Sequence, residues 1–262
     1  MALYGVLGDI HGNREALEAA LAALGEHSVD AILCVGDLVG YNADGNECVE
    51  MLTQCGALCI AGNHDLIGTG LLGFERCSNK AMHSLKRTRR ALSPAAVREL
   101  QSLPAHRRIE DRVVLVHGGV RDVQQYMTQP RHILQNAAYL REDFPGASVC
   151  FFGHTHEQRV YETDGQSVRE IDVHAPAVAL RPDRIHFVNP GSVDASRKRS
   201  QKYAELAIFD SERLACVFRR VPYDDAATEA KAAAQGYRID GWRDRIYDWQ
   251  RRVIGPRQVD VT

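Results

Sequence analysis

Short apolar runs that each meet a glycine and a metal-capable side chain constrain the fold of this chain most. Runs of about four to eight aliphatic and β-branched residues bounded by glycine are typical of buried strands in an α/β sheet. Aspartate, asparagine or histidine follows each of these runs, so polar side chains are expected where the strands end. Five runs have this pattern, at residues 3–7, 31–35, 57–61, 113–116 and 149–152.

Helical patterns separate the early runs. Leucines at helical spacing cover residues 14–24, and Gly25 follows them as a helix stop. A second helix is expected at residues 47–54. Alternating strands and helices predict parallel strands with right-handed connections, whose carboxyl-end loops meet at one edge of the sheet. Ligands bind at that edge in such sheets, so we expect the polar side chains there to form a site.

The side chains at this edge form a set of metal donors. Imidazole, carboxylate and amide donors without thiolate suit Mn, Fe, Co, Ni or Zn. The set is larger than the four ligands of one tetrahedral zinc, so two divalent ions that share a ligand fit better. Asp37 is the expected bridge, because each of its carboxylate oxygens can bind one ion. The seven donors are Asp9, His11, Asp37, Asn63, His117, His154 and His156.

Composition and missing motifs exclude other classes of protein. The chain has 32 basic and 34 acidic residues and a net charge of -2, which argues against a polymeric nucleic acid as partner. No apolar run reaches the roughly 18 residues of a membrane span, and no signal-peptide pattern is present. The seven cysteines include no CxxC pair, which favours reduced thiols and a cytoplasmic location. No GxGxxG, GxSxG or P-loop motif occurs.

The ordered motifs D-x-H, G-D, G-N-H-D, H-G and G-H-T-H resemble those of the calcineurin-like metallophosphoesterase superfamily. Residues 116–119, 189–193 and 219–223 are similar to its small stand-alone bacterial branch. The resemblance covers residue 3 to about residue 225 and is weakest across a basic segment at residues 74–108. It implies an α/β fold, a four-layer αββα sandwich of two mixed β-sheets, with a dinuclear site at its edge.

The resemblance also implies a role for each motif residue. Like others of the superfamily, the chain is expected to hydrolyse a small phosphodiester or phosphomonoester by attack of a metal-bound hydroxide. His64 is expected to protonate the leaving group or to contact a phosphate oxygen, and Asn63 and Arg197 to contact substrate. Asp65 either orients His64 or caps the following turn. One ion would be held by Asp9, His11, Asp37 and His156, and the other by Asp37, Asn63, His117 and His154.

Other functions remain open. The loop after Asp37 lacks the arginine and aspartate of Ser/Thr protein phosphatases, which argues against a dedicated protein phosphatase. A dinucleoside polyphosphate hydrolase, similar to diadenosine tetraphosphatase, is the main alternative. The charge balance disfavours a nuclease. A binding scaffold that has lost catalysis is a further alternative, which the complete donor set and His64 argue against.

The chain is expected to form a single domain over residues 1–262. The basic segment at residues 74–108 is expected to be a helical insertion near the active site, either as a solvated face or as a lid that attracts an anionic substrate. Antiparallel strands are expected at residues 185–188, 203–210 and 215–221, and helices at about 224–254. The last helix either docks on the protein's own sheet or forms a homodimer contact through one apolar face. That face contains Trp242, Ile246, Trp249 and Val253.

Overall fold

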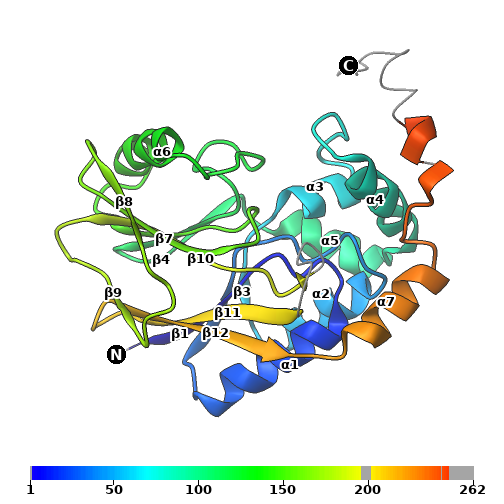
Figure 1. Cartoon of the computed structure of the whole chain (residues 1–262), viewed down its shortest axis with the longest axis horizontal. Helices are drawn as coiled ribbons and strands as arrows, with labels where there is room; N and C mark the ends of the chain where they lie inside the picture. Colours follow the sequence, from blue (N-terminus) through cyan, green and yellow to red (C-terminus); the bar gives the residue numbers. More distant parts are fainter. Residues whose placement is uncertain (1, 196–201, 243, 248–262) are drawn as a thin grey trace.

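Two six-stranded mixed sheets face each other in the computed structural model, which describes residues 2–195, 202–242 and 244–247 (Figure 1). The first sheet has the order β3-β2-β1-β11-β12-β9 and the second β4-β5-β6-β10-β7-β8. The strands of the first sheet are β1 (Leu3–Leu7), β2 (Ala31–Cys34), β3 (Leu58–Cys59), β9 (Val178–Ala179), β11 (Tyr203–Asp210) and β12 (Ala215–Pro222). Those of the second are β4 (His106–Glu110), β5 (Val113–Val116), β6 (Val149–Phe151), β7 (Gln158–Thr163), β8 (Val168–Ile171) and β10 (Ile185–Pro190).

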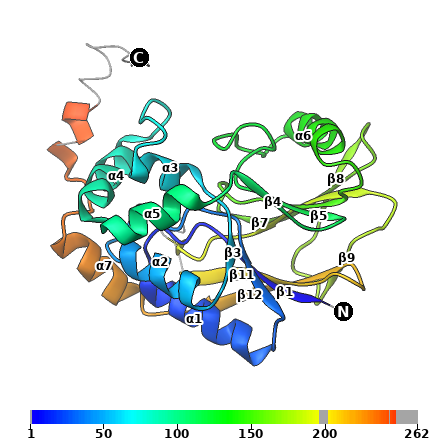
Figure 2. The same cartoon turned by 180° about the vertical axis from the view of Figure 1, so that it is seen from behind.

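Helices cover the outer faces of the two sheets and complete a four-layer α/β sandwich. In Figure 1, α6 (Pro130–Asp143) lies outside the second sheet, and α1 (Arg14–Glu26) and α2 (Gly45–Gln54) lie outside the first. Figure 2 shows the same layers from behind. The expected fold class is therefore confirmed.

Three buried apolar clusters correspond to the three interfaces between these layers. Between the sheets, Val6 and Phe209 of the first sheet pack in one cluster with Leu115 and Phe151 of the second. The leucine stripe of α1 packs on the outer face of the first sheet, and α6 packs on the second. Burying side chains on both faces explains why inner strands such as β1, β5 and β6 are almost continuously apolar.

The strands that carry the motifs are parallel where the pattern requires it. β1 pairs in parallel with β2, and β2 with β3. In the second sheet β5 pairs in parallel with β6. Antiparallel strands complete both sheets, since β11 joins β1 and β7 joins β10. The carboxyl ends of β1, β2, β3, β5 and β6 are thus directed to a common edge.

The basic segment at residues 74–108 is helical over most of its length. It contains α4 (Asn79–Ala91) and α5 (Pro94–Ser102), and the Ser93 hydroxyl accepts a hydrogen bond from Ala96 N as a helix cap. Its last residues form β4, which the sequence did not predict. β4 is an edge strand paired only with β5 in the described part of the chain, and its sequence, with a single apolar residue (Ile109) among five, lacks the alternation of polar and apolar residues that predicts a strand.

The C-terminal region is partly described. The first expected helix is α7 (Asp225–Ala234), and residues 241–242 and 244–247 are also helical. Trp242 and Ile246 are exposed, whereas Trp249 and Val253 lie outside the described residues. Within the described ranges, no helix combines the length and apolar character needed to cross a bilayer.

Candidate metal centre

Five strand-end loops bring seven predicted donors and His64 to one place. These side chains include three sets of three, and within each set the ligand atoms lie within 4.8 Å of one another. All the side chains of these sets are buried. Asp37 belongs to two of the sets. The sets are Asp9, His11 and His156; His11, Asp37 and His64; and Asp37, His117 and His154.

The backbone of this centre is strained at the donors themselves. Seven non-glycine residues among those described have positive φ, and five of these are predicted ligands. Their φ values lie between 51° and 67°, in the left-handed region that costs an L-residue of order 1–3 kcal/mol. Strain of this kind concentrates at functional sites, where it aims a side chain that ordinary geometry would turn away. The five ligands are Asp9, His11, Asp37, His154 and His156.

Backbone carbonyls orient two of the imidazoles. His117 Nδ1 lies 2.7 Å from the carbonyl oxygen of Val35, and His11 Nδ1 lies 3.3 Å from that of Val39. A carbonyl oxygen can only accept, so we assign the ring proton to Nδ1 in both histidines. The Nε2 atoms then present lone pairs toward the centre, which is the arrangement found in metal-binding histidines.

When the rings are neutral, as in metal-binding histidines, the inward-facing atoms are acceptors that lie close together. His117 Nε2 is 3.1 Å from Asn63 Oδ1 and 3.3 Å from Asp37 Oδ2, and His11 Nε2 is 3.0 Å from His156 Nε2. Lone pairs at such distances repel unless a proton or a cation lies between them. This donor set therefore fits divalent cations.

Electrostatics at the centre are dominated by burial and by neighbouring charges. Burial opposes protonation of His117, but the charge of Asp37 outweighs it and raises the pKa of His117 to about 9. Burial and the neighbouring His64 hold the pKa of His11 well below its usual value. Burial alone would raise the pKa of Asp37, but the facing His117 and His64 keep it well below the ordinary range. Asp37 is therefore an ionised carboxylate.

Asp37 uses its two oxygens differently from the expectation of one oxygen for each ion. Oδ1 accepts a hydrogen bond of 2.7 Å from the backbone N–H of His64. Oδ2 faces both neighbouring imidazoles, at 3.7 Å from His11 Nε2 and 3.3 Å from His117 Nε2. The same oxygen is thus directed to both ligand sets.

His64 lies at the start of α3 (Asn63–Thr69), beside the donors. Its ring centroid is 4.5 Å from that of His11 and 4.7 Å from that of Tyr41. Gly40 has a φ of 120°, and a Cβ at this position would lie 2.3 Å from His64 Nδ1. Residue 40 must therefore be glycine for the imidazole to occupy its position.

Asp65 organises the loops around Asp37. Its carboxylate accepts hydrogen bonds from the backbone N–H groups of Asp37 and Gly62, each at 2.9 Å, and of Val39 at 3.1 Å. Of the two roles left open by the sequence, these contacts show capping, because Asp65 closes the first turn of α3. Burial and the charge of Asp37 raise the pKa of Asp65 to about 7.

Two aromatic residues at the centre were missed by the sequence analysis. The ring of Tyr41 lies 4.6 Å from that of His11, and the ring of Tyr126 lies 4.0 Å from that of His154. Tyr41 could have been found from its position in the glycine-bounded loop after Asp37, whereas no motif marks Tyr126. Arg197, predicted to contact substrate, lies outside the described residues.

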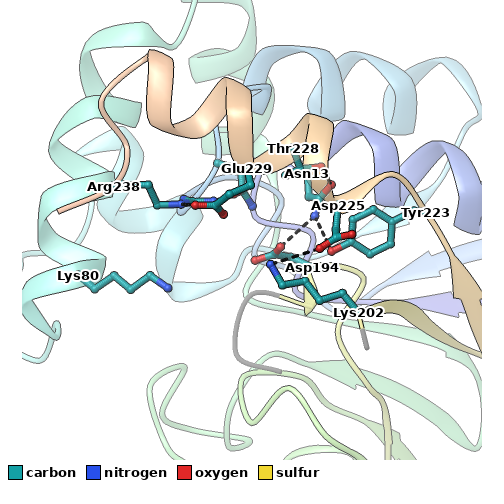
Figure 3. A pocket seen from close by; sticks show the side chains of 10 residues that line it. Asn13, Lys80, Asp194, Lys202, Tyr223, Asp225, Thr228, Glu229 and Arg238 are labelled. Carbon is teal, nitrogen blue, oxygen red and sulfur yellow. Dashed lines mark hydrogen bonds and ion pairs between the residues drawn. The ribbon is translucent and has the colours of Figure 1, made fainter. Parts of the chain in front are cut away.

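A polar pocket of about 150 Å³ has Asn42, the residue after Tyr41, in its lining. Figure 3 shows this pocket from close by. Lys80 of α4 points into the pocket from one side, and Asp194 and Lys202 lie on the other. Lys80 Nζ lies 5.6 Å from the centroid of the Tyr41 ring. The basic segment at residues 74–108 therefore reaches the neighbourhood of the donors.

Arg238 fixes the wall shared by the pocket and the centre. Its guanidinium donates to the carbonyl oxygen of Tyr41 at 2.9 Å and to Asn42 Oδ1 at 3.0 Å. Asn42 in turn donates its backbone N–H and its side-chain amide to the carbonyl oxygen of His11. These bonds connect the C-terminal part of the chain to a predicted metal ligand.

Comparison with known proteins gives one family. The calcineurin-like phosphoesterase superfamily domain matches residues 2–213. A metallophosphoesterase from Sphaerobacter thermophilus has a crystal structure similar to this chain, with 27% sequence identity and a TM-score of 0.74, over 93% of this chain and 97% of that one.

Two further proteins are similar over most of their length. A hypothetical protein from Pyrococcus horikoshii OT3 shares the fold at 18% identity, with a TM-score of 0.68, over 94% of this chain and 97% of that one. An uncharacterised protein of Methanocaldococcus jannaschii is 28% identical over 230 residues, which are 85% of this chain and 88% of the relative.

Proposed function

Since the chain belongs to the calcineurin-like phosphoesterase superfamily and is a metallophosphoesterase, we propose that it hydrolyses a small phosphodiester or phosphomonoester with two divalent cations. The observation that carries the proposal is the position of Asp37 Oδ2, which faces a histidine of each ligand set. In this proposal Asp9, His11, Asp37 and His156 hold one ion, and Asp37, Asn63, His117 and His154 hold the other. The donor types suit Mn, Fe, Co, Ni or Zn.

Divalent cations supply, when bound, a water of lowered pKa and positive charge that stabilises the phosphate in the transition state. The protein contributes position and protons. Asn63 directs its carbonyl oxygen to the donors, so its amide N–H₂ group is available to a phosphate oxygen. His64, fixed through its backbone by Asp37, protonates the departing oxygen when the bond between phosphorus and that oxygen breaks. Asp65 acts as a positioning residue for Asn63 and His64, because its side chain caps the first turn of α3, which carries them.

Burial of the donors also supports catalysis over a scaffold role. Each of the seven donors is at most 5% exposed, so charges at the centre interact in a medium of low dielectric constant. Burying these polar groups on a strained backbone costs free energy, and a scaffold that only binds a protein partner does not require such a centre. We propose a cytoplasmic enzyme, supported by seven cysteines that are all free thiols.

A substrate panel tests the proposed function. Purified, metal-depleted protein would be reconstituted with Mn, Ni, Zn or Mg and assayed with a bis-aryl phosphodiester, an aryl monophosphate, a 2′,3′-cyclic nucleotide and diadenosine tetraphosphate. We expect metal-dependent turnover of a simple ester, abolished by a chelator and restored by the metal. Turnover of diadenosine tetraphosphate alone would favour the polyphosphate hydrolase, and no turnover with any metal would contradict the proposal.

A further inference from the structure

One exposed aromatic side chain lies directly on a ligand of the proposed centre. The Tyr126 ring is centred 4.0 Å from the His154 ring, with an angle of 37° between the planes. Tyr126 is 46% exposed and His154 only 5%. The tyrosine therefore covers part of the imidazole and keeps much of its own surface in solvent beside the centre. The described residues contain three other large exposed apolar side chains: Leu71, Trp242 and Ile246.

The loop that carries Tyr126 is anchored on both sides of the ring. Met127 is fully buried in the cluster beneath α6. Gln125 Oε1 accepts a hydrogen bond of 2.9 Å from the side chain of Asn136 in α6. At Gly119 a Cβ would lie 2.1 Å from Gln125 Oε1, so the loop closes against backbone that has no side chain. Tyr126 is therefore an exposed residue between the half-buried Gln125 and the buried Met127.

A second group of bonds ties this loop to the residues before α4. Arg76 donates to both carboxylate oxygens of Asp122, each at 2.9 Å, and to the carbonyl oxygen of Gln124 at 2.9 Å. Asp122 also accepts from the backbone N–H of Gln124 at 2.9 Å. These groups are partly exposed and each bond contributes little by itself. Together they hold the ring in place before a ligand arrives, which lowers the entropic cost of stacking on it.

An aromatic face at this position suits a planar partner. Aryl rings and nucleobases stack on aromatic side chains in offset geometry, with centroids about 4.5–7 Å apart. A phosphate ester whose organic group extends past His154 would place that group within reach of the Tyr126 ring, which contacts His154.

We propose that Tyr126 forms a stacking subsite for the organic group of the substrate, and that the enzyme prefers phosphate esters whose alcohol carries a planar aromatic group. The inference rests on the proposed function, because it requires a phosphate group at the centre. Tyr126 acts through its ring face and takes no part in bond breaking, so it affects binding of the substrate rather than the chemical step.

Binding of two inert phosphonates tests the subsite without turnover. Phenylphosphonate and methylphosphonate both have a P–C bond that the enzyme cannot hydrolyse, and they differ in the ring. Calorimetry with the Mn-reconstituted protein should show about 5- to 20-fold tighter binding of phenylphosphonate. Tyr126→Ala should remove this preference, and Tyr126→Phe should keep it. Trp242→Ala, which removes an exposed aromatic side chain elsewhere, is the matched control and should also keep it.

Three results would overturn the subsite. They are equal affinity of the wild-type protein for both phosphonates, equal weakening of both by Tyr126→Ala, and loss of the preference in Tyr126→Phe, which would assign the contact to the hydroxyl group.

Turnover distinguishes a nucleobase from a simple aryl group. Adenosine 5′-monophosphate and ribose 5-phosphate have the same leaving alkoxide and differ in the base. Tyr126→Ala should raise KM for the nucleotide by about fivefold or more and leave kcat, and both constants for ribose 5-phosphate, nearly unchanged. The same change seen with phenyl phosphate alone supports a subsite for aryl groups. If phosphonate binding depends on Tyr126 but no ester is hydrolysed, the proposed function is wrong and the subsite stands. If esters are hydrolysed with the same constants in wild type and Tyr126→Ala, the subsite is wrong and the proposed function stands.

Discussion

His117 and His186 are both buried histidines whose Nε2 atoms lie 3.3 Å from a carboxylate oxygen, that of Asp37 and that of Glu162. Their pKa values nevertheless move in opposite directions. At His117 burial is outweighed by the charge of Asp37, and the pKa rises to about 9. At His186 burial outweighs the hydrogen bond and charge of Glu162, and the pKa falls below the usual value.

The surroundings explain the difference. His186 and Glu162 are opposite residues on the regular antiparallel strands β10 and β7. The second carboxylate oxygen of Glu162 lies 3.1 Å from the guanidinium of Arg169, and His186 Nε2 accepts from the backbone N–H of Arg181 at 3.3 Å. Both carboxylate oxygens of Glu162 thus face a neighbour, and the pair stands on regular strands rather than on converging loops. A buried contact between histidine and carboxylate therefore does not by itself identify a site.

With neutral imidazole rings, which metal binding requires, the candidate metal centre differs in having more converging acceptors than protons. Asn63 Oδ1, Asp37 Oδ2 and His117 Nε2 lie within hydrogen-bond distance of one another in two of the three pairs, on loops that end strands. Positive φ at five donors adds strain that the His186 pair lacks. Surplus acceptors on strained loops mark a cation site, because only a bound charge compensates for both costs.

The largest expected effect is at the shared ligand. Asp37→Asn removes the carboxylate charge that faces both ligand sets, so it should lower the affinity for both ions together. Activity should fall by about 1000-fold or more. Metal content by mass spectrometry and turnover are the measurements. Glu162→Gln is the matched control from the second region and should retain both ions. Selective loss of one ion in Asp37→Asn would contradict the shared position.

A smaller loss is expected at His64. His64→Ala leaves all seven donors in place, so the protein should still bind two ions while kcat falls about 100-fold or more. Faster reaction of an aryl ester relative to an alkyl ester in this variant should accompany the loss, because a phenoxide needs less protonation. Unchanged kcat with an alkyl ester would remove the proposed proton donor.

The positions of the donors were predictable from sequence, whereas their fine geometry was not. Each predicted ligand lies in the loop that follows an apolar run, so strand pattern and motif order together located Asp9, His117 and the others. The use of one Asp37 oxygen for both sets depends on the N–H of His64, a contact between two loops that no local pattern encodes. The capping role of Asp65 likewise depends on Val39 and Asp37 lying beside it in the fold.

Two kinds of feature could not be predicted from the sequence: polar edge strands, and contacts between residues far apart in the chain. β4 was not predicted because an edge strand tolerates polar residues such as His106 and Arg108, which are exposed. Tyr126 stands in a loop with no motif, and only the folded loop brings its ring onto His154. The insertion, by contrast, was visible in part because Ser93 and Pro94 form an ordinary helix start.

A substitution in the His186–Glu162 pair should lower the stability of the fold and leave metal binding unchanged. His186→Leu leaves Glu162 without this partner and should cost about 1–3 kcal/mol in the free energy of unfolding at neutral pH. The lowered pKa of His186 means that the unfolded chain takes up a proton first as the pH falls. Wild-type stability from this residue is therefore full above pH 6.5, the usual histidine value, and is lost as the pH falls from there to the lower folded pKa.

Urea unfolding between about pH 8 and pH 5 measures this effect. The decrease in stability below pH 6.5 should be shallower in His186→Leu than in the wild-type protein. A reduced metal content in His186→Leu would contradict the claim that only the candidate metal centre, and not the His186–Glu162 pair, binds cations.

The smallest effect is expected at a surface outside both regions. Trp242 and Ile246 are exposed, and we propose that they contact a second copy of the chain. Changing both to glutamate should convert a dimer to a monomer in analytical ultracentrifugation, with little change in metal content or kcat. A monomeric wild-type protein would remove this proposal and leave the metal centre unaffected.

Anomalous diffraction from crystals grown with Mn²⁺ tests the central claim most directly. We predict two peaks about 3.5–4 Å apart at the sheet edge, with Asp37 Oδ2 in contact with both, and no peak at His186 and Glu162. A single peak that Asp37 does not contact, no peak at this edge, or a peak at the His186 pair would contradict the account.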